Sequence, residues 1–365
     1  MQADFNFFFY KGRVALYAIL KSIDIKKGDE VIVPGFTCVA VPNAVAYLGA
    51  RPVYADIDPG TYNISPGFIA KRINARTRAI IAQHTFGIPA DMDPLATLAR
   101  KHNIPVIEDS CHAIGSRYKG REVGSFGDAA FFSSQWSKPA TTGLGGWAKV
   151  NNSSSLQDLK TFYEPLPRPS IMESFFLRAL YLMHENFLTP SIFWMARKIY
   201  RELSKRGLVI GSSTNEELSY EMPSAYAKKM SDWQINLLFK KLNSIASVIE
   251  HRKWVVSKYE TLLPQAGLSP LRLPNYMEPV FLRYPVSVAD KKGILESARR
   301  NRIEMGDWFV SPVHPNLSNW EKIGYKKGMC PNAEKACEQT INLPTHPRIG
   351  IREIEKNVSF LKKFR

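Results

Sequence analysis

Cysteine is scarce in this 365-residue sequence. The four cysteines, Cys38, Cys111, Cys330 and Cys337, include no CxxC pair of the kind that binds zinc. So few thiols in a chain of this length argue against a disulfide framework and fit the reduced state of a cytoplasmic protein. We therefore expect a cytoplasmic protein with free thiols and no metal.

Long hydrophobic runs are also missing. No stretch of roughly 18 uncharged apolar residues occurs, so no membrane-spanning helix is expected. The N-terminal stretch MQADFNFFFYKGR has an apolar part too short for a signal peptide, and we expect a mature N-terminus. A hydrophobic fraction of 45% without a low-complexity tract predicts a soluble globular protein.

Acidic residues are outnumbered by basic ones. The chain has 49 Lys and Arg against 33 Asp and Glu, and the resulting net charge of +16 favours anionic partners. No zinc finger, RRM signature or basic-region zipper accompanies this charge. We therefore do not expect nucleic acid as a partner.

Helix-like and strand-like segments alternate between residues 13 and 121. The helical pattern occurs in VALYAILKSI, AVPNAVAYLGA and MDPLATLARKHN, and apolar strands occur in DEVIVPG, RPVYADID, RAIIAQHT and IPVIEDS. This alternation predicts an α/β fold with a mostly parallel central sheet covered by helices. Ligands in such folds bind at the carboxyl ends of strands, where His84, Asp109 and the pair Ser133 and Ser134 are expected.

The second half of the chain has a different pattern. Residues 232–263 carry apolar side chains at helical spacing and predict one long helix that leads into a second domain. Beyond it, the strand VFLRYPVSV and the helices KKGILESARRN and IREIEKNVSFLKKF are typical of a smaller α+β domain. We predict a large domain over residues 1–245 and a small C-terminal domain over residues 246–365.

A helical insertion is predicted at about residues 165–215 within the large domain. Its segment 191–206, SIFWMARKIYRELSKR, is apolar on one face and strongly basic on the rest, as in a basic amphipathic helix. The apolar face could pack on the enzyme or on a dimer mate, which is the simpler interpretation. Peripheral contact with a membrane surface through residues 191–206 remains an alternative.

Lys138 lies in an unusual place, between an apolar strand and a Thr/Gly-rich turn in FFSSQWSKPATTGLGGW. A lysine that is desolvated in an apolar pocket loses its proton more easily, and the neutral amine can form a Schiff base with a carbonyl. A lone lysine after a strand is more often a surface residue. The residues around Lys138 must therefore distinguish a catalytic lysine from a surface lysine.

A covalent pyridoxal phosphate (PLP) cofactor would explain this lysine. PLP needs a carboxylate beside its pyridine nitrogen, donors for its phosphate and a hydrogen bond to its ring oxygen. Asp109 ends a buried strand, where a carboxylate needs a cationic partner, and His112 follows three residues later. Ser133 and the N–H groups of Gly12 and Arg13 at a helix start suit the phosphate. Asp109 could instead cap a helix, and Arg13 could be a solvated surface residue.

Six motifs occur in order over nearly the whole chain. They are GDEVIVPGFTCVAVPNAVAYLGARPVYADIDPGTYNI, HTFGIPADMD, PVIEDSCHAIGSRYKGREVGSFGDAAFFSSQWSK, TTGLGG, PNAE and LPTHP. Through these motifs the chain resembles the DegT/DnrJ/EryC1/StrS aminotransferases, which modify sugars on the fold-type I PLP scaffold. The resemblance implies a PLP-dependent aminotransferase with a Schiff base at Lys138. It also implies a pyridinium partner at Asp109, a ring-oxygen contact at His112 and a phosphate contact at Ser133.

The chain departs from the family pattern at several positions. Relatives usually carry a Ser-Gly-Thr-type turn where this chain has Lys11-Gly12-Arg13, which implies that a guanidinium also contacts the phosphate. Thr37 and Cys38 are expected beside the cofactor, although many relatives place a stacking aromatic where Cys38 stands. Leu144 replaces the usual Glu of a GEGG turn. Residues 227–229, Ala-Lys-Lys, replace an Asn-Tyr-Arg whose Asn reaches a neighbour's phosphate, so a lysine is expected to substitute.

The family resemblance also implies the reactants and the assembly. It implies a keto-sugar substrate, nucleotide-linked, with glutamate as the amino donor, in polysaccharide or secondary-metabolite sugar biosynthesis. A homodimer with active sites at the interface is expected. Trp308, His314 and His84 are the expected substrate contacts, although each histidine could equally be a structural residue.

Two alternatives stand beside the aminotransferase. One is a PLP-dependent sugar dehydratase or lyase on the same scaffold. Sugar 3-dehydratase relatives carry a histidine in place of the lysine, so Lys138 argues against that branch. The other is a noncatalytic PLP-fold protein at a membrane surface, suggested by the basic segment 191–206.

Overall fold

A seven-stranded β-sheet lies at the centre of the computed structural model, which describes residues 6–152, 156–187, 202, 222–315 and 320–364. In spatial order its strands are β1 (Asn6–Phe9), β10 (Gly146–Val150), β9 (Ala129–Ser133), β6 (Val106–Asp109), β5 (Thr77–Gln83), β2 (Glu30–Pro34) and β4 (Arg51–Ala55). Strands β9, β6, β5, β2 and β4 pair in parallel, and β10 is antiparallel to both of its neighbours. The predicted mostly parallel sheet is confirmed.

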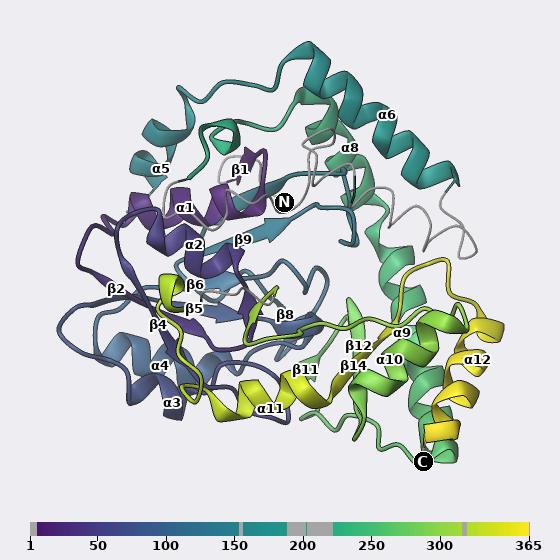
Figure 1. Ribbon diagram of the computed structural model, residues 1–365. Helices are drawn as coiled ribbons and strands as arrows, with labels where there is room; N and C mark the ends of the chain where they lie inside the picture. The colour runs from purple at the N-terminus through teal and green to yellow at the C-terminus, as the bar shows by residue number, and fades with distance from the viewer. Residues whose placement is uncertain (1–5, 153–155, 188–201, 203–221, 316–319, 365) are drawn as a thin grey trace.

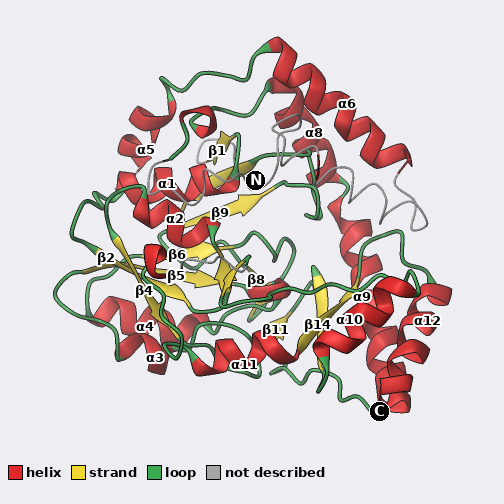
Figure 2. Ribbon diagram, viewed as in Figure 1, coloured by secondary structure: helices red, strands yellow, loops and turns green. Residues whose placement is uncertain are grey.

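Helices cover both faces of this sheet (Figures 1 and 2). One face carries α1 (Gly12–Ser22), α2 (Ala40–Ala46) and α5 (Leu156–Tyr163), and the other carries α3 (Pro66–Ala70) and α4 (Met92–Lys101). Every residue of β2, β6 and β9 is buried, which explains why these strands are apolar without alternation. The α/β fold class is therefore confirmed by the structure.

The C-terminal part mixes helices with a two-stranded antiparallel sheet. It comprises α9 (Ile245–Leu262), β12 (Arg283–Ser287), α10 (Lys291–Arg300), α11 (Pro331–Gln339), β14 (Thr340–Pro344) and α12 (Ile351–Leu361), with β12 paired to β14. Small strands β7 (Arg117–Tyr118), β8 (Arg121–Glu122) and β11 (Met277–Glu278) form a separate three-stranded sheet. One hydrophobic core includes both Ile32 of β2 and Tyr284 of β12, so the predicted boundary at residue 245 stays a prediction.

The single long helix predicted over residues 232–263 is wrong, because the structure has two helices there. Helix α8 (Asp232–Asn243) ends at Ser244, whose φ of −101° and ψ of 10° lie outside the α-helical region. The Ser244 hydroxyl donates a hydrogen bond to the carbonyl of Lys240 at 3.2 Å, a local alternative to continued helix. Helix α9 then begins at Ile245.

The predicted helical insertion is partly described. Helix α6 (Ile171–Phe187) lies at the edge of the molecule (Figure 1), and the basic segment 191–206 lies outside the described residues apart from Glu202. None of the helices in the described ranges has both the length and the hydropathy needed to cross a bilayer.

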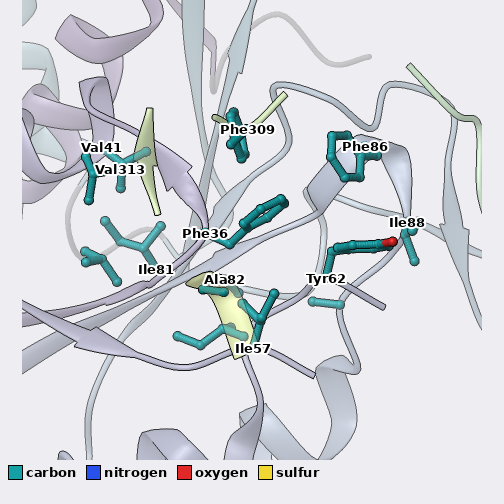
Figure 3. Close-up of a cluster of buried hydrophobic side chains, with 14 of the residues drawn as sticks. Phe36, Val41, Ile57, Tyr62, Ile81, Ala82, Phe86, Ile88, Phe309 and Val313 are labelled. Carbon is teal, nitrogen blue, oxygen red and sulfur yellow. The ribbon is translucent and has the colours of Figure 1, made fainter. Parts of the chain in front are cut away.

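A segment from the C-terminal half returns to the central sheet. Strand β13 (Val313–His314) pairs in parallel with β3 (Thr37–Cys38). Phe309 packs edge-on against Phe36 with ring centroids 4.9 Å apart, and both belong to the buried cluster in Figure 3. The carboxyl edge of the sheet is therefore walled by residues far apart in the sequence.

Gly12 and Gly146 allow α1 to approach the sheet closely. A Cβ atom on Gly146 would lie 2.3 Å from the Cα of Gly12 and 2.6 Å from the carbonyl oxygen of Phe132. Because these neighbours are backbone atoms, they cannot turn aside as a side chain could. The first turn of α1 is thereby held against the carboxyl end of β9.

Gly146→Ala should destabilise the fold by about 1–3 kcal/mol, the usual cost of overpacking a filled interior. Urea denaturation would measure the change in the free energy of unfolding. Gly67→Ala is the matched control, because the nearest atom to its Cβ would be 3.8 Å away. The control should change stability by no more than about 0.5 kcal/mol, and an equal effect of both substitutions would contradict the close approach.

Candidate active site

A cavity of about 1260 Å³ opens at the carboxyl edge of the central sheet. Gln83, Asp109 and Ser133, the last residues of β5, β6 and β9, all line it. Its other walls come from α6, α8, α9 and residues 304–309. This is the position at which ligands bind in parallel α/β sheets.

Most of the predicted site residues meet in this cavity. Those that line it are Gly12, Arg13, Cys38, Asp109, His112, Ser133, Lys138, Trp308 and His314. Thr37 and His84 lie outside its lining. The residues come from five separate stretches of the chain, which only the fold brings together.

Lys138 is nearly buried, with 9% of its surface exposed. Its backbone N–H donates to the carbonyl of Gln135 at 2.9 Å, which closes the turn after β9, and its Nζ lies 5.6 Å from the ring centroid of Trp308. Burial lowers the pKa of the Lys138 ammonium, although Cys111 and Asp109 offset part of this effect. The neutral amine needed for attack on a carbonyl is therefore easier to form here than in water.

Asp109 presents a buried carboxyl group to the same cavity. Its Oδ1 accepts a hydrogen bond from the backbone N–H of Cys111 at 3.0 Å. Burial raises the pKa of Asp109, and the hydrogen bond from Cys111 and the charge of Lys138 only partly counter it. Such a carboxylate is stabilised when a cation binds next to it, and a protonated pyridine nitrogen is one such cation.

The start of α1 forms an anion-binding corner of the cavity. The N-cap residue, Lys11, makes no side-chain cap, and the first two residues of the helix, Gly12 and Arg13, both line the cavity. Ser133 lies directly beside this turn, because its Cβ would be 3.3 Å from a Cβ placed on Gly12. A hydroxyl, a helix N-terminus and the Arg13 side chain together suit a phosphate.

His112 and Trp308 form an aromatic wall. Their ring centroids are 5.5 Å apart and the planes differ by 16°. His112 Nδ1 accepts from the backbone N–H of Phe86 at 3.4 Å, which leaves the proton of the neutral ring on Nε2. Burial and the charges of Lys138 and Arg283 hold the pKa of His112 well below its usual value. The imidazole is therefore a neutral hydrogen-bond donor.

Thr37 lies behind the cavity wall rather than in it. Its hydroxyl donates to Oε1 of Gln83 at 2.6 Å, and the Gln83 amide nitrogen donates to the carbonyl of Phe36 at 3.0 Å and to Thr85 Oγ1 at 2.9 Å. These bonds fix the orientation of Gln83, which does line the cavity. Thr37 thus positions a cavity residue that the sequence analysis missed.

The prediction that His84 contacts substrate is not supported by its position. His84 is fully buried, and its Nδ1 accepts from the backbone N–H of Ala90 at 3.0 Å. Its Nε2 therefore carries the proton and donates to Glu108 Oε2 at 3.0 Å. Burial alone would raise the pKa of Glu108, but bonds from His84 and from backbone N–H groups lower it. His84 has a structural role beneath the cavity.

Several other side chains that were expected to contact a ligand bond to groups of the protein in this structure. Ser134 hydrogen-bonds to Thr142 at 2.8 Å and does not line the cavity. Lys228 Nζ lies 2.7 Å from Glu173 Oε1, and Lys229 Nζ donates to the carbonyl of Glu164 at 2.9 Å. Both lysines thus have partners in their own chain, and the predicted contact with a neighbour's phosphate stays a prediction.

Three arginines of the cavity, Arg252, Arg283 and Arg348, were missed in the sequence. Arg252 on α9 and Arg283 at the start of β12 both line it. The signal for Arg283 was present, because a charged residue interrupts the apolar run VFLRYPV. No motif connected that strand to Lys138, since the two lie far apart in the sequence.

Comparison with known proteins decides what this arrangement represents. The sequence profile of the DegT/DnrJ/EryC1/StrS aminotransferase family matches residues 8–165 and 195–362. The chain belongs to this family. Members of the DegT/DnrJ/EryC1/StrS family are PLP-dependent, so the protein is a PLP-dependent aminotransferase and PLP is its cofactor. This excludes the noncatalytic alternative.

Individual family members agree with this assignment. GDP-perosamine synthase of Caulobacter vibrioides is 45% identical over 141 residues, which are 39% of this chain and 38% of that protein. UDP-2-acetamido-2-deoxy-3-oxo-D-glucuronate aminotransferase of Pseudomonas aeruginosa is 26% identical over 344 residues, 94% of this chain and 82% of that protein. The solved structure of the aminotransferase TlmJ from Streptoalloteichus hindustanus superposes with a TM-score of 0.76 at 21% identity. That superposition covers 99% of this chain and 86% of TlmJ, and it shows the same fold.

Proposed function

We propose that this enzyme transfers an amino group from glutamate to a keto sugar carried on a nucleotide. The observation that carries the proposal is that Lys138, Asp109 and the anion-binding start of α1 all face one cavity. The named relatives act on nucleotide-linked sugars, and a net charge of +16 favours an anionic nucleotide. The cavity of about 1260 Å³ has room for such a substrate.

The residues of the cavity fit PLP in their chemistry. The phosphate would be held by Ser133, Arg13 and the N–H groups of Gly12 and Arg13, and the pyridine nitrogen by Asp109. The Nε2–H of His112 would donate to the ring oxygen. When bound, PLP supplies an electron sink that makes the α-proton of the amino donor acidic.

Lys138 would have two roles in turn. Its amine would hold the cofactor covalently, and burial, which lowers the pKa of Lys138, favours the neutral amine that this bond requires. As a free amine, Lys138 would take the proton from the donor's α-carbon and later deliver a proton to the sugar carbon. The Asp109 carboxylate would hold the pyridine nitrogen in its protonated form.

A stepwise experiment tests the proposal. Protein loaded with PLP should show a visible absorbance band that L-glutamate bleaches, and a nucleotide-linked keto sugar should then restore the band. The free keto sugar without its nucleotide is the control, and it should restore the band far more slowly. Bleaching by no amino acid, or recovery that ignores the nucleotide, would contradict the proposal.

The proposal includes a homodimer. Helix α6 exposes a row of large apolar side chains, Ile171, Met172, Phe175, Phe176, Leu182 and Met183. Apolar surface of this extent is usually covered by another protein surface, and the family resemblance indicates a second copy of the chain.

Phe175→Glu should shift the protein from dimer to monomer, because the new charge would have to be buried at the interface. The molar mass measured by light scattering after size-exclusion chromatography checks this. Lys292→Glu, an exposed change on α10, is the control and should leave the mass unchanged. A wild-type monomer with full activity would remove the homodimer from the proposal.

A further inference from the structure

Arg283 is a cavity-lining cation whose charge has no ionic partner in the described part of the protein. No carboxylate of the described residues lies within 4.0 Å of its guanidinium, and Glu304 and Asp307 act on it only through longer-range attraction. The Glu304 carboxylate instead lies with both oxygens 3.1 Å from Nε2 of His346. The guanidinium of Arg283 can therefore form an ion pair with an anionic group of a ligand in the cavity.

The Arg283 side chain is held in one orientation. Its guanidinium carbon lies 4.5 Å from the ring centroid of Trp308, and the backbone N–H of Trp308 donates to Asn342 Oδ1 at 2.8 Å. A Cβ atom on Gly306 would lie 2.6 Å from Nη1 of Arg283, so a glycine at this position leaves the room that the guanidinium occupies. A guanidinium stacked on an indole keeps its planar fork free for a bidentate acceptor.

The neighbouring arginine, Arg252, forms hydrogen bonds with groups of the protein itself. Arg252 donates through Nη1 to the carbonyls of Phe281 and Leu282, at 3.1 and 3.0 Å, and to the Thr345 hydroxyl at 2.6 Å. Burial and the charge of Arg283 lower the pKa of Arg252 to about 10. Arg252 therefore supports the wall behind Arg283 and adds to the positive potential there.

The charge of Arg283 is also felt at the reactive end of the cavity. After burial, it is among the causes that lower the pKa values of Lys138 and His112. Arg283 and Lys138 are also neighbours of one indole, because the Arg283 guanidinium carbon and the Lys138 Nζ lie 4.5 and 5.6 Å from the ring centroid of Trp308. An anionic group bound at Arg283 would thus belong to a molecule whose other end reaches Lys138.

We propose that Arg283 binds a carboxylate of a reactant and that this carboxylate belongs to the amino-acid donor. The inference rests on the proposed transamination, in which the donor must bring its amine to Lys138 while its carboxylate stays ionised. A carboxylate matches the planar fork of a guanidinium, and pairing it there relieves the uncompensated charge of the cavity. A uronate sugar carries the same chemical group, so the test separates the two sources.

The test compares Arg283→Gln and Arg283→Lys with Arg300→Gln. Arg300 is an exposed arginine on α10 with 78% of its side chain accessible, so the control removes the same charge far from the cavity. Isothermal titration calorimetry measures the binding of 2-oxoglutarate to the PLP-loaded protein, which has no amino group to transfer and therefore cannot turn over. UDP-glucuronate serves as the unreactive uronate probe, and thermal melting verifies that each variant is folded.

Arg283→Gln should weaken 2-oxoglutarate binding about 10- to 100-fold, the range for a lost charge-assisted hydrogen-bonded pair. It should raise the L-glutamate concentration that half-bleaches the visible band by the same factor. Arg283→Lys protein should bind 2-oxoglutarate with an affinity between those of Arg283→Gln and the wild type, because lysine keeps the charge but loses the planar fork. The affinity of Arg300→Gln protein should stay within about twofold of the wild-type value.

Each outcome decides the matter. Weaker binding of UDP-glucuronate with unchanged 2-oxoglutarate binding would overturn the donor as the source. Unchanged binding of both probes would overturn the carboxylate site altogether. A wild-type band that no amino acid bleaches would count against the proposed function instead, while the calorimetric comparison would still decide the role of Arg283.

Discussion

Lys138→Ala protein should lose the visible absorbance band of the bound cofactor and at least about 10⁴-fold of its transamination rate, the upper range for general acid–base catalysis. The substitution removes both the amine that bonds the cofactor and the base that moves the proton. Absorbance spectra of the PLP-loaded protein and kcat/KM for the keto-sugar reaction provide the measurement.

Lys292→Ala is the matched control for this variant. Lys292 is an exposed lysine on α10, so its loss changes the net charge equally without touching the cavity. The control should keep both the band and the rate. Full turnover by Lys138→Ala protein would end the assignment of the catalytic residue, and a band retained in that variant would place the cofactor bond at another amine.

Asp109→Asn should lower kcat/KM by about 10²- to 10³-fold, the usual effect of removing one preorganised electrostatic group. An amide cannot hold the pyridine nitrogen in its protonated form, so the electron sink weakens. The amide oxygen can still accept the bond from the N–H of Cys111, which keeps the loop in place. Steady-state kinetics and the spectrum of the same preparation check both points.

The spectrum separates this prediction from simple loss of cofactor. Because Lys138 is intact, Asp109→Asn protein should keep a visible band when saturated with PLP, although the position of the band should shift with the protonation of the ring. A variant with the rate of the wild type would rule out Asp109 as the partner of the ring nitrogen. A variant without any band would show that Asp109 acts mainly in cofactor binding.

The sheet and one part of the site were predictable from local pattern. Fully buried strands lack alternation and stand out in the sequence, and β6 and β9 end directly at Asp109 and Ser133. The same rule led to the wrong residue after β5. Neighbouring residues of a strand point to opposite sides, so Gln83 faces the cavity while His84 is turned into the core.

Other features depend on contacts that local pattern does not contain. The break at Ser244 separates two helices whose apolar spacing continues across it, so periodicity alone joined them. Arg252 and Arg283 reach the cavity only because α9 and β12 fold back to the sheet. Their roles follow from tertiary structure, which a single sequence does not reveal.

The pairing of β13 with β3 bears on how the enzyme matures in the cell. Trp308, Phe309 and His314 line the cavity beside Cys38, so a chain still on the ribosome lacks this side of the cavity until residue 314 has emerged. We therefore expect the complete vitamin-binding pocket to form only after most of the chain has been synthesised.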